Sequence, residues 1–341
     1  MNKRKLRIGI NGFGRIGRVA SRIICNRNTS ELAAINSRAD VESHAYLLKH
    51  DSTYGTYDKN VSVQNGKLIV DTEEVAVYNN NLPSEIPWKD VKVDLVIDST
   101  GLFRTTEDLM GHLQSGASLV VLSAPAKDKT KTLVMGVNET TFDPSVDKII
   151  SNSSCTTNCL STTLKVLNDA FQVKRGFMTT THAVTDSQNL LDNSHKKEER
   201  LRRSAFASMI PASTGSAKDI GKLYPTLAGK LICQSIRIPL FTGSLINLTA
   251  EITRTTTKDD VNRAFETAEG GSLKGILEVA KEPLVSHDFI GNTHSSIIDP
   301  YLTQVLDGNL VNIYAWYDNE WGYANRLIDM AEYLSQKAGI I

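Results

Sequence analysis

The stretch Lys5-Leu6-Arg7-Ile8-Gly9-Ile10-Asn11-Gly12-Phe13-Gly14-Arg15-Ile16-Gly17 decides the first part of the fold. Residues 5–11 alternate as a strand does, residues 18–25 follow a helical pattern, and residues 31–36 form a second short apolar strand. A Gly-x-Gly-x-x-Gly turn between a strand and a helix lets a pyrophosphate approach the helix N-terminus. Since strand, turn, helix and second strand follow in this order, we predict a βαβ unit that binds a dinucleotide.

The residues after the second strand bear on which dinucleotide is bound. An acidic residue commonly stands there and accepts a hydrogen bond from a free ribose 2′-hydroxyl, but this sequence has Asn36-Ser37-Arg38. A hydroxyl and a guanidinium suit a 2′-phosphate, because arginine pairs well with phosphate oxygens. We therefore predict a preference for NADP. The alternative is NAD, with Arg38 as a solvated loop residue and Asp40 as the missing acid.

Further short apolar runs extend the first half of the chain into an α/β sheet. Residues 61–70 alternate around Asn65-Gly66, which indicates a hairpin. Buried strands are predicted at residues 93–98, 119–123, 133–138 and 148–152. Several of these end in small polar residues, and ligands bind at that edge of open α/β sheets. The candidate residues at this edge are Ser99, Thr100, Gly101 and Ser123.

A second informative stretch is Ser151-Asn152-Ser153-Ser154-Cys155-Thr156-Thr157-Asn158-Cys159. A strand-like run, 148–150, leads into it, and a helical pattern, 160–171, follows it. Cys155 is thereby expected at a helix N-terminus, where free N–H groups and the helix dipole favour a thiolate. Because thiolates attack carbonyl carbons, Cys155 is a candidate nucleophile. Cys159 is expected to be a buried structural thiol, and a redox or metal partner is the alternative.

A cysteine nucleophile usually works with a base or a cationic partner. Among seven histidines, His182 lies in a strand-like run, residues 178–185. Beside Cys155 it could stabilise the thiolate and transfer protons. The alternative is a histidine packed inside or at the edge of a sheet.

The composition sets outer limits on the function. A chain of 341 residues is long enough for two domains. Lys plus Arg and Asp plus Glu are both 38, so the charge gives no indication of a nucleic-acid or membrane partner. The apolar run Ile8–Ile10 is too short for a signal peptide. Four sparse cysteines favour a reducing cytoplasm, and without a Cys-x-x-Cys pair we predict no metal site.

The chain resembles the phosphorylating glyceraldehyde-3-phosphate dehydrogenases over nearly its whole length. The resemblance lies in residues 9–18, the Cys155 run, Thr181-His182-Ala183, and residues 211–218, 236–239 and 316–323. It implies an α/β fold with an N-terminal Rossmann domain, residues 1–152, and an α+β catalytic domain on an antiparallel sheet, residues 153–318. A C-terminal helix, residues 319–341, would pack back on the first domain.

The resemblance also implies a reaction. Cys155 would attack the aldehyde of D-glyceraldehyde 3-phosphate to give a hemithioacetal, and His182 would take the hydroxyl proton as hydride passes to the nicotinamide. Inorganic phosphate would then cleave the thioester and give 1,3-bisphosphoglycerate. The implied phosphate-binding residues are Thr185 and Arg237 for the substrate, and Ser154, Thr156, Thr214 and Gly215 for inorganic phosphate. The implied cofactor-binding residues are Gly12, Gly14, Arg15, Ile16, Gly17, Asn36, Ser37, Arg38, Ser99, Thr100, Gly101, Ser123, Ser194, Asn319 and Tyr323.

Several positions depart from the family pattern. Ser37 stands where NAD-using members have Asp, and Asn193-Ser194 stands where NAD-specific members have Leu-Pro. The second position lies near the adenosine ribose of a neighbouring subunit in the family's homotetramer, so both departures favour NADP. The pair Leu240-Phe241 leaves a related erythrose-4-phosphate dehydrogenase open. A noncatalytic dinucleotide-binding regulatory protein is the other alternative.

Overall fold

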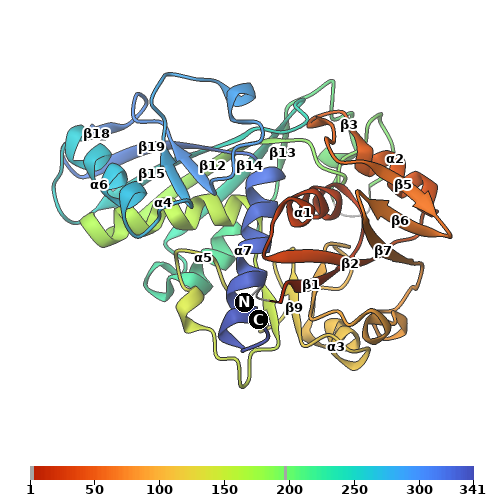
Figure 1. The fold of residues 1–341 in the computed structure, drawn as a ribbon. Helices are drawn as coiled ribbons and strands as arrows, with labels where there is room; N and C mark the ends of the chain where they lie inside the picture. Colours follow the sequence, from red (N-terminus) through yellow and green to blue (C-terminus); the bar gives the residue numbers. More distant parts are fainter. Residues whose placement is uncertain (1–3, 196–197) are drawn as a thin grey trace. The chain divides into compact units, whose positions relative to one another are not determined.

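The computed structural model describes residues 4–195 and 198–341. The chain divides into two compact units, Met1–Ser153 with Ala324–Ile341, and Ser154–Tyr323 (Figure 1). The domain limits expected from the sequence, 152 and 318, fall near these bounds. Each unit has its own sheet and its own core.

The first unit is built on a sheet whose strand order, in the described part of the chain, is β10-β11-β9-β8-β1-β2-β7-β6-β5. The bounds are β1 Leu6–Asn11, β2 Ser30–Asn36, β5 Val61–Gln64, β6 Lys67–Val70, β7 Glu73–Tyr78, β8 Leu95–Asp98, β9 Leu119–Leu122, β10 Lys131–Thr132 and β11 Ile149–Ser151. The pairs from β10 across to β7 are parallel, and β5, β6 and β7 pair antiparallel. The order reverses at β1, between β2 and β8, and such a switch point is where open α/β sheets bind ligands.

Helices cover both faces of this sheet. The bounds are α1 Arg15–Asn26, α2 Val41–Lys49 and α3 Thr106–Gln114. Figure 1 shows α1 and α3 on opposite sides of β1 and β2. The helices lie on opposite faces because both crossover connections are right-handed, while the chain passes from β1 to β2 in one direction across the sheet and from β8 to β9 in the other. The last helix, α7 Trp321–Lys337, is tied to the first unit by Arg27, whose guanidinium pairs with Asp329 at 2.7 Å and Glu332 at 3.1 Å.

Short elements fill the connections. Two small strands pair as a hairpin, and single turns of 3₁₀-helix join longer elements. They are β3 His50–Asp51, β4 Gly55–Thr56, η1 Pro83–Glu85, η2 Trp88–Val91, η3 Glu139–Thr141, η4 Arg200–Arg202, η5 Pro225–Leu227 and η6 Ser286–Phe289.

One strand expected in the first unit is absent from its predicted place. Residues 133–134 have no regular structure and residues 135–138 form a turn, and the neighbouring strand is β10, which precedes them. The Asn138 side chain explains this, because its Oδ1 accepts from Val134 N at 2.9 Å and its Nδ2 donates to Thr132 O at 2.9 Å. A side chain that takes up backbone groups in this way competes with strand pairing. The hairpin at 61–70 and the strands at 93–98, 119–123 and 148–152 are confirmed, with small shifts of their ends.

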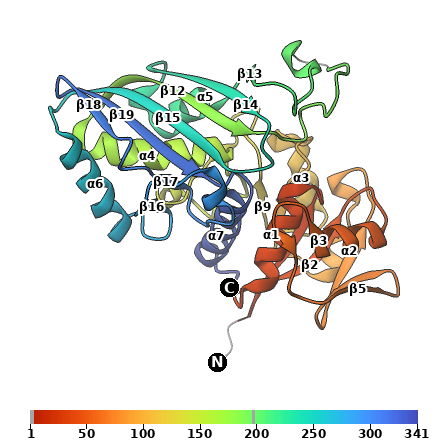
Figure 2. The same cartoon turned by 90° about the horizontal axis from the view of Figure 1, so that it is seen from above.

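The second unit has a mixed sheet with the order β13-β14-β12-β15-β19-β17-β16, and β18 adds to β19 (Figure 2). The bounds are β12 Val173–Ala183, β13 Ile210–Ala212, β14 Leu231–Ile238, β15 Ser244–Ile252, β16 Leu277–Val279, β17 Ser296–Ile298, β18 Gln304–Leu306 and β19 Leu310–Tyr317. Most pairs are antiparallel, as expected, but β12 pairs with β14 and β16 with β17 in parallel. The long connection between β12 and β14 makes a parallel pair possible, since such a pair needs a crossover.

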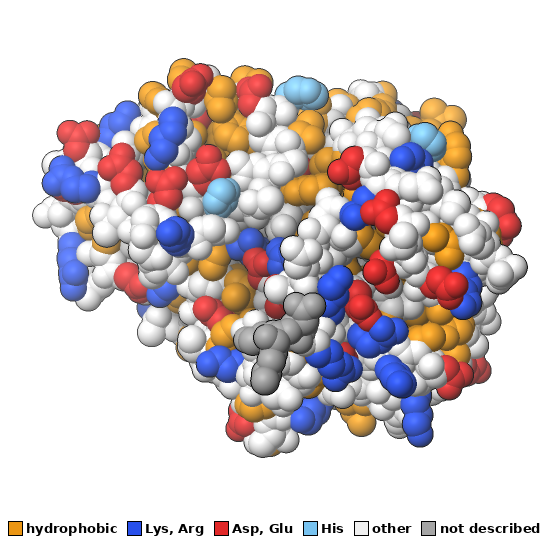
Figure 3. Space-filling view, viewed as in Figure 1, with side chains coloured by type: hydrophobic (Ala, Val, Ile, Leu, Met, Phe, Trp, Pro, Cys, Tyr) orange, Lys and Arg blue, Asp and Glu red, His pale blue; other side chains and the backbone are white. Residues whose placement is uncertain are grey.

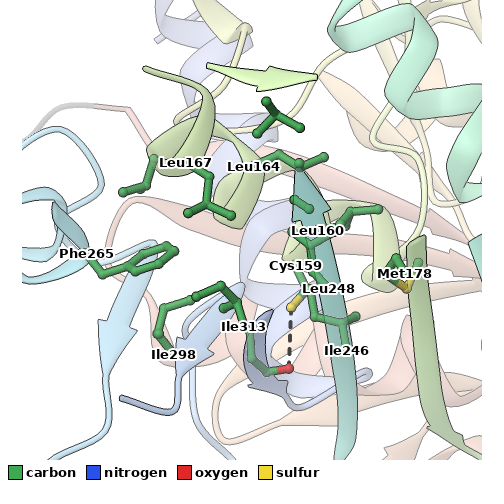
Figure 4. Packing of buried hydrophobic residues seen from close by; sticks show 14 of the residues in the cluster. Cys159, Leu160, Leu164, Leu167, Met178, Ile246, Leu248, Phe265, Ile298 and Ile313 are labelled. Carbon is green, nitrogen blue, oxygen red and sulfur yellow. Dashed lines mark hydrogen bonds between the residues drawn. The ribbon is translucent and has the colours of Figure 1, made fainter. Parts of the chain in front are cut away.

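Helices pack on one face of this second sheet, and the hydrophobic core of the unit lies between them and the sheet. Their bounds are α4 Cys155–Phe171, α5 Ser216–Leu223 and α6 Lys258–Gly270. Leu160, Leu164 and Leu167 recur at helical spacing along α4 and belong to the same buried cluster as Phe265 of α6 (Figure 4). Cys159 lies in the same core, where its thiol is 3.9 Å from the Ala315 carbonyl oxygen. This face fixes the position of α4 and therefore of its first residue, Cys155.

Candidate active site

Cys155 is the first residue of α4. Ser154 is the N-cap, and its hydroxyl accepts a hydrogen bond from Thr157 N at 3.1 Å. A serine in this position starts a helix by satisfying one of its free N–H groups. The predicted placement of Cys155 at a helix N-terminus is therefore what the structure shows.

His182, near the end of β12, lies beside this cysteine. Cys155 Sγ and His182 Nε2 are 3.4 Å apart, although the two residues are 27 positions apart in the chain. The imidazole is buried. A thiol and an imidazole at this distance can exchange a proton, which is the arrangement of an activated nucleophile.

Arg237, on the neighbouring strand β14, approaches the other ring nitrogen of His182. The parallel register pairs His182 with Arg237, and Arg237 Nη1 lies 2.5 Å from His182 Nδ1. The Ala183 carbonyl oxygen is 2.6 Å from Nδ1 and 3.2 Å from Nη1. His182 Nδ1 thus has a donor and an acceptor within reach. When Nδ1 donates to the carbonyl, Nε2 faces Cys155 without a proton and can accept one.

Burial sets the protonation of this pair. Burial, together with the Arg237 charge, lowers the pKa of His182 to about 3. Burial also raises the pKa of the Cys155 thiol, while Arg237 and the hydrogen bond with Thr156 act in the opposite direction. Desolvation of the buried sulfur opposes the thiolate that the helix N-terminus favours, so these two effects shift the pKa of Cys155 in opposite directions. The thiolate expected from the sequence stays a prediction.

Three buried hydroxyl groups form a hydrogen-bonded network next to the nucleophile. Tyr317 OH lies 2.9 Å from Thr156 Oγ1 and 2.8 Å from Thr180 Oγ1. It links the residue after Cys155 to β12, the strand of His182. Nothing in the spacing of the sequence singled out Tyr317 for this role.

The residues expected to bind phosphoryl groups lie in the same unit. Arg237 lines a cavity of about 560 Å³, together with Ser187, Glu198 and Ser213, and Ser194, which was expected to bind the cofactor, lines the same cavity. Thr185 adjoins it through Ser187, whose hydroxyl is 2.9 Å from Thr185 Oγ1. Hydroxyl groups around one arginine can bind a phosphate without holding it too tightly.

Two further expected phosphate residues stand at the start of α5. Gly215 is the N-cap and supplies no side chain, and a Cβ built on it would meet nothing within 4 Å. Thr214 Oγ1 lies 3.0 Å from Ser216 Oγ. The N-terminus of α5 thus offers N–H groups and hydroxyls to an anion. Glu198, which Ser213 Oγ contacts at 2.5 Å, is a carboxylate beside these groups that the sequence analysis missed.

The glycine turn of the first unit has the form that a dinucleotide needs. Gly12 has φ +94°, and a Cβ there would lie 2.7 Å from Thr100 N. A Cβ on Gly17 would lie 2.1 Å from the Gly12 carbonyl oxygen, whereas one on Gly14 would meet nothing within 4 Å. These are the tight turn, the close helix packing and the open approach that the three glycines provide in dinucleotide sites. Ile16 follows within α1, and the Arg15 guanidinium pairs with Asp51.

The residues after β2 are those expected to distinguish a ribose 2′-hydroxyl from a 2′-phosphate. Asn36 is occupied within the protein, since its Nδ2 donates to Asn11 Oδ1 at 2.8 Å. Ser37 is half-buried and Arg38 is exposed. Asp40 is the N-cap of α2 and accepts from Ser43 N at 2.7 Å and Ser43 Oγ at 2.9 Å. Asp40 therefore serves the helix, which weighs against its acting as the missing acid.

The remaining candidates of the first unit follow β8 and β9. Ser99 Oγ donates to the Gly12 carbonyl at 2.7 Å, and Thr100 Oγ1 donates to Asp98 Oδ1 at 2.7 Å. Gly101 has φ +68°. Ser123 N donates to Asp98 O at 2.9 Å. These residues line the carboxyl edge of the sheet beside the glycine turn, as the sequence predicts.

Asn319 and Tyr323 are both buried in the second unit. Asn319 Oδ1 accepts from Ser244 Oγ at 2.8 Å and from Thr242 Oγ1 at 3.2 Å. Neither hydroxyl was singled out by the sequence analysis, because both lie more than seventy residues before Asn319.

Within residues 4–195 and 198–341, no group of three or more His, Cys, Asp or Glu side chains could hold a metal ion. No helix in these ranges is long and apolar enough to cross a membrane. All four cysteines are free thiols.

Comparisons with known proteins give a consistent result. Residues 6–106 match the family model described as the NAD binding domain of glyceraldehyde 3-phosphate dehydrogenase, and residues 154–319 match the model of its C-terminal domain. Glyceraldehyde-3-phosphate dehydrogenase 1 of Bacillus cereus is 45% identical over 97% of this chain and 99% of its own length. The Geobacillus stearothermophilus enzyme is 44% identical over the same shares, and enzyme 1 of Schizosaccharomyces pombe is 43% identical over 97% and 98%.

Proposed function

Since the chain belongs to the glyceraldehyde-3-phosphate dehydrogenase family and is an NAD(P)-dependent dehydrogenase, we propose that it interconverts D-glyceraldehyde 3-phosphate plus phosphate and 1,3-bisphosphoglycerate. The observation that carries this proposal is the contact of 3.4 Å between Cys155 Sγ and His182 Nε2, with Arg237 beside the imidazole. Cys155, His182 and Arg237 thus lie close together, which supports their roles as nucleophile, base and phosphoryl-binding cation.

The first step is addition of Cys155 to the aldehyde. His182 Nε2 takes the thiol proton as the S–C bond forms, and the proton passes to the aldehyde oxygen to give a neutral hemithioacetal. Arg237 and Thr185 hold the phosphoryl group of the substrate and so place the aldehyde carbon near Sγ. Positioning of this kind lowers the barrier because it removes the entropy of bringing the groups together.

His182 acts again in the oxidation. Nε2 accepts the hydroxyl proton of the hemithioacetal, and Cys155 is left in a thioester. When bound, the nicotinamide cofactor supplies the hydride acceptor for this step. The glycine turn and the Ser99–Gly101 segment would hold the dinucleotide, and Asn319 would donate to its carboxamide.

The thioester is then cleaved by inorganic phosphate. Ser154, Thr156, Thr214 and Gly215 would bind this phosphate through hydroxyl and backbone N–H groups. A phosphate oxygen attacks the thioester carbon, the C–S bond breaks, and the Cys155 sulfur leaves with the proton held by His182. The acyl phosphate keeps the free energy of oxidation that hydrolysis would lose.

NADP is the cofactor that we propose to be preferred. Ser37 stands where a carboxylate would repel a 2′-phosphate, Arg38 is exposed close by, and Asp40 caps α2. An arginine and a hydroxyl favour the phosphorylated ribose. NAD remains the second cofactor.

We also propose a cytoplasmic homotetramer that works in carbohydrate metabolism. The sheet face of the second unit that faces away from α4 carries an exposed apolar cross-strand pair, Phe177 opposite Ile232, with 63% and 52% of their surfaces exposed. Such a pair suits contact with a second copy of the chain. On the face seen in Figure 3, basic and acidic side chains are interspersed, so no patch of one sign points to a nucleic-acid partner there.

The test is a steady-state assay with glyceraldehyde 3-phosphate and inorganic phosphate, run in parallel with NADP and NAD. Phosphate-dependent turnover that is faster with NADP supports the whole proposal. Turnover that is faster with NAD retains the reaction and refutes the cofactor preference. Faster turnover of erythrose 4-phosphate than of glyceraldehyde 3-phosphate would make erythrose 4-phosphate the assigned substrate. No turnover with either aldehyde would refute the proposed reaction.

A further inference from the structure

Ser244, the first residue of β15, connects two parts of the proposed active site. Its side chain is buried, and its hydroxyl oxygen accepts a hydrogen bond from Ala183 N at 3.1 Å. The same hydroxyl donates to Asn319 Oδ1 at 2.8 Å. One buried hydroxyl therefore bonds both the peptide group that follows His182 and the amide of Asn319.

The sheet register explains why a side chain is needed at this point. The antiparallel pairing of β12 with β15 runs only to Thr181 opposite Leu245. Ser244 itself pairs with Tyr317 of β19, on the other side of β15. Figure 2 shows β12, β15 and β19 side by side. Beyond the last β12–β15 pair, the Ser244 hydroxyl replaces a backbone acceptor for Ala183 N.

The hydrogen-bond directions leave Ser244 only one way to bond Asn319. Ala183 N is a donor, so it takes a lone pair of the Ser244 oxygen, and the single hydroxyl proton points to Asn319. Thr242 also contacts Asn319 Oδ1, but it lies closer to the Asp318 carboxylate, at 3.0 Å against 3.2 Å. Because a carboxylate only accepts, it draws the Thr242 proton. Ser244 is thus the hydroxyl that orients the Asn319 amide.

The backbone around Asn319 is already held by Asp318. This buried carboxylate accepts from Gly291 N at 2.8 Å, Glu320 N at 2.9 Å and Trp321 N at 2.8 Å. The freedom that remains to Asn319 is rotation of its terminal amide, which exchanges Oδ1 and Nδ2. With Oδ1 turned to the hydroxyls, Nδ2 points away from them as a donor.

We propose that Ser244 is a positioning residue that presents Asn319 Nδ2 to the nicotinamide carboxamide. Because the same hydroxyl bonds Ala183 N, it also fixes the position of this donor relative to the end of β12, where His182 lies. The inference rests on the proposed function, in which Asn319 binds the carboxamide. Loss of the Ser244 hydroxyl frees the amide to turn and offer an acceptor in place of the donor. The cofactor then binds more weakly, and the nicotinamide ring is no longer held with a single face toward the substrate.

The experiment compares wild type, Ser244→Ala and a matched control, Ser235→Ala. Ser235 is another buried serine of the same sheet, and its hydroxyl has no hydrogen-bond partner among the described residues. Glyceraldehyde 3-phosphate deuterated at the aldehyde carbon is oxidised, and NMR of the reduced cofactor shows which C4 position carries the deuterium. The KM for NADP and for NAD is measured in parallel.

We expect the cofactor KM of Ser244→Ala to rise about tenfold, the effect of one lost hydrogen bond of ordinary strength. A measurable share of deuterium should appear on the second face of the ring. Ser235→Ala should match wild type in both respects. Ser244→Thr, which restores a hydroxyl, should recover single-face transfer.

Partial unfolding does not change the distribution of deuterium between the two C4 positions, because only folded enzyme makes product. If Ser244→Ala gives no active fraction, Ser244→Cys of similar volume should show the same two changes in smaller size. Wild-type KM and single-face transfer in the alanine or cysteine variant would overturn the inference. A lack of phosphate-dependent turnover in wild type and in Ser235→Ala would instead refute the proposed function, and with it this inference.

Discussion

Arg237 Nη1 lies 2.5 Å from His182 Nδ1, while the other ring nitrogen of His182 faces Cys155 Sγ at 3.4 Å. The imidazole is therefore held between a permanent cation and the nucleophile. Since the same arginine is expected to bind the substrate phosphoryl group, its movement toward that group would leave Nδ1 to donate to Ala183 O. The bare Nε2 could then act as the base.

The first prediction concerns pH. Burial and, second to it, Arg237 lower the pKa of His182, whereas burial raises the pKa of Cys155 and Arg237 offsets part of that rise. In Arg237→Leu both pKa values should rise. Since the imidazole must be neutral to accept a proton, the acid limb of kcat/KM should move to higher pH. The pH profile is measured with unphosphorylated glyceraldehyde, which makes no use of the phosphoryl site.

Arg237→Lys keeps the charge, and its acid limb is expected near that of wild type. An acid limb that stays in place in Arg237→Leu would show that the guanidinium does not govern the base. The Cys155–His182 pair is close enough to titrate as a unit, so the limb reports the pair.

Cys155→Ser should abolish oxidation, because a serine hydroxyl beside a neutral imidazole is a far weaker nucleophile than a thiol. Dinucleotide binding should stay nearly unchanged, as measured by cofactor fluorescence titration. The matched control is Cys233→Ser, which removes a half-buried thiol of β14 and should retain turnover. Normal turnover by Cys155→Ser would end its assignment as the nucleophile.

His182→Asn should slow thioester formation by about two to four orders of magnitude, the usual effect of losing a general base. Single-turnover formation of reduced cofactor gives this rate directly. His287→Asn, which changes an exposed histidine of η6, should leave the rate unaltered. If the rate is equal in both variants, the base lies elsewhere.

Ser37→Asp should lower the ratio of NADP to NAD efficiency, because a carboxylate repels the 2′-phosphate and accepts from the 2′-hydroxyl. The ratio of the two kcat/KM values measures this. Ala39→Asp adds the same charge at an exposed position two residues along the chain and should have a smaller effect. A ratio that does not fall in Ser37→Asp would contradict the proposed NADP preference.

Tyr317→Phe should lower the free energy of unfolding by about 1–3 kcal/mol, because it leaves the buried hydroxyls of Thr156 and Thr180 without their shared partner. Urea unfolding measures the change. Tyr224→Phe removes a tyrosine hydroxyl that makes one bond, to Ser161 O, and is expected to cost about 0.5–1.5 kcal/mol. Equal losses in the two variants would count against the network.

Several local features in both units were determined by the sequence itself. The hairpin at Asn65-Gly66, the packing of Gly17 on the Gly12 carbonyl and the start of α4 at Cys155 all depend on residues close in the chain. Local patterns record such features directly. The failure at residues 133–138 is local too, since apolar residues resembled a strand while Asn138 bonded their backbone into a turn.

The active-site geometry was decided only by the tertiary structure. His182 reaches Cys155, and Arg237 reaches His182, because β12 and β14 run parallel in a register that pairs these residues. Burial raises the pKa of Cys155 against the effect of the helix N-terminus, and the Ser244 hydroxyl bonds both Ala183 and Asn319. Strand register and desolvation depend on which distant segments pack together. The sequence thus supplied the chemical groups, and packing set their distances, their hydrogen-bond partners and the direction in which their pKa values shift.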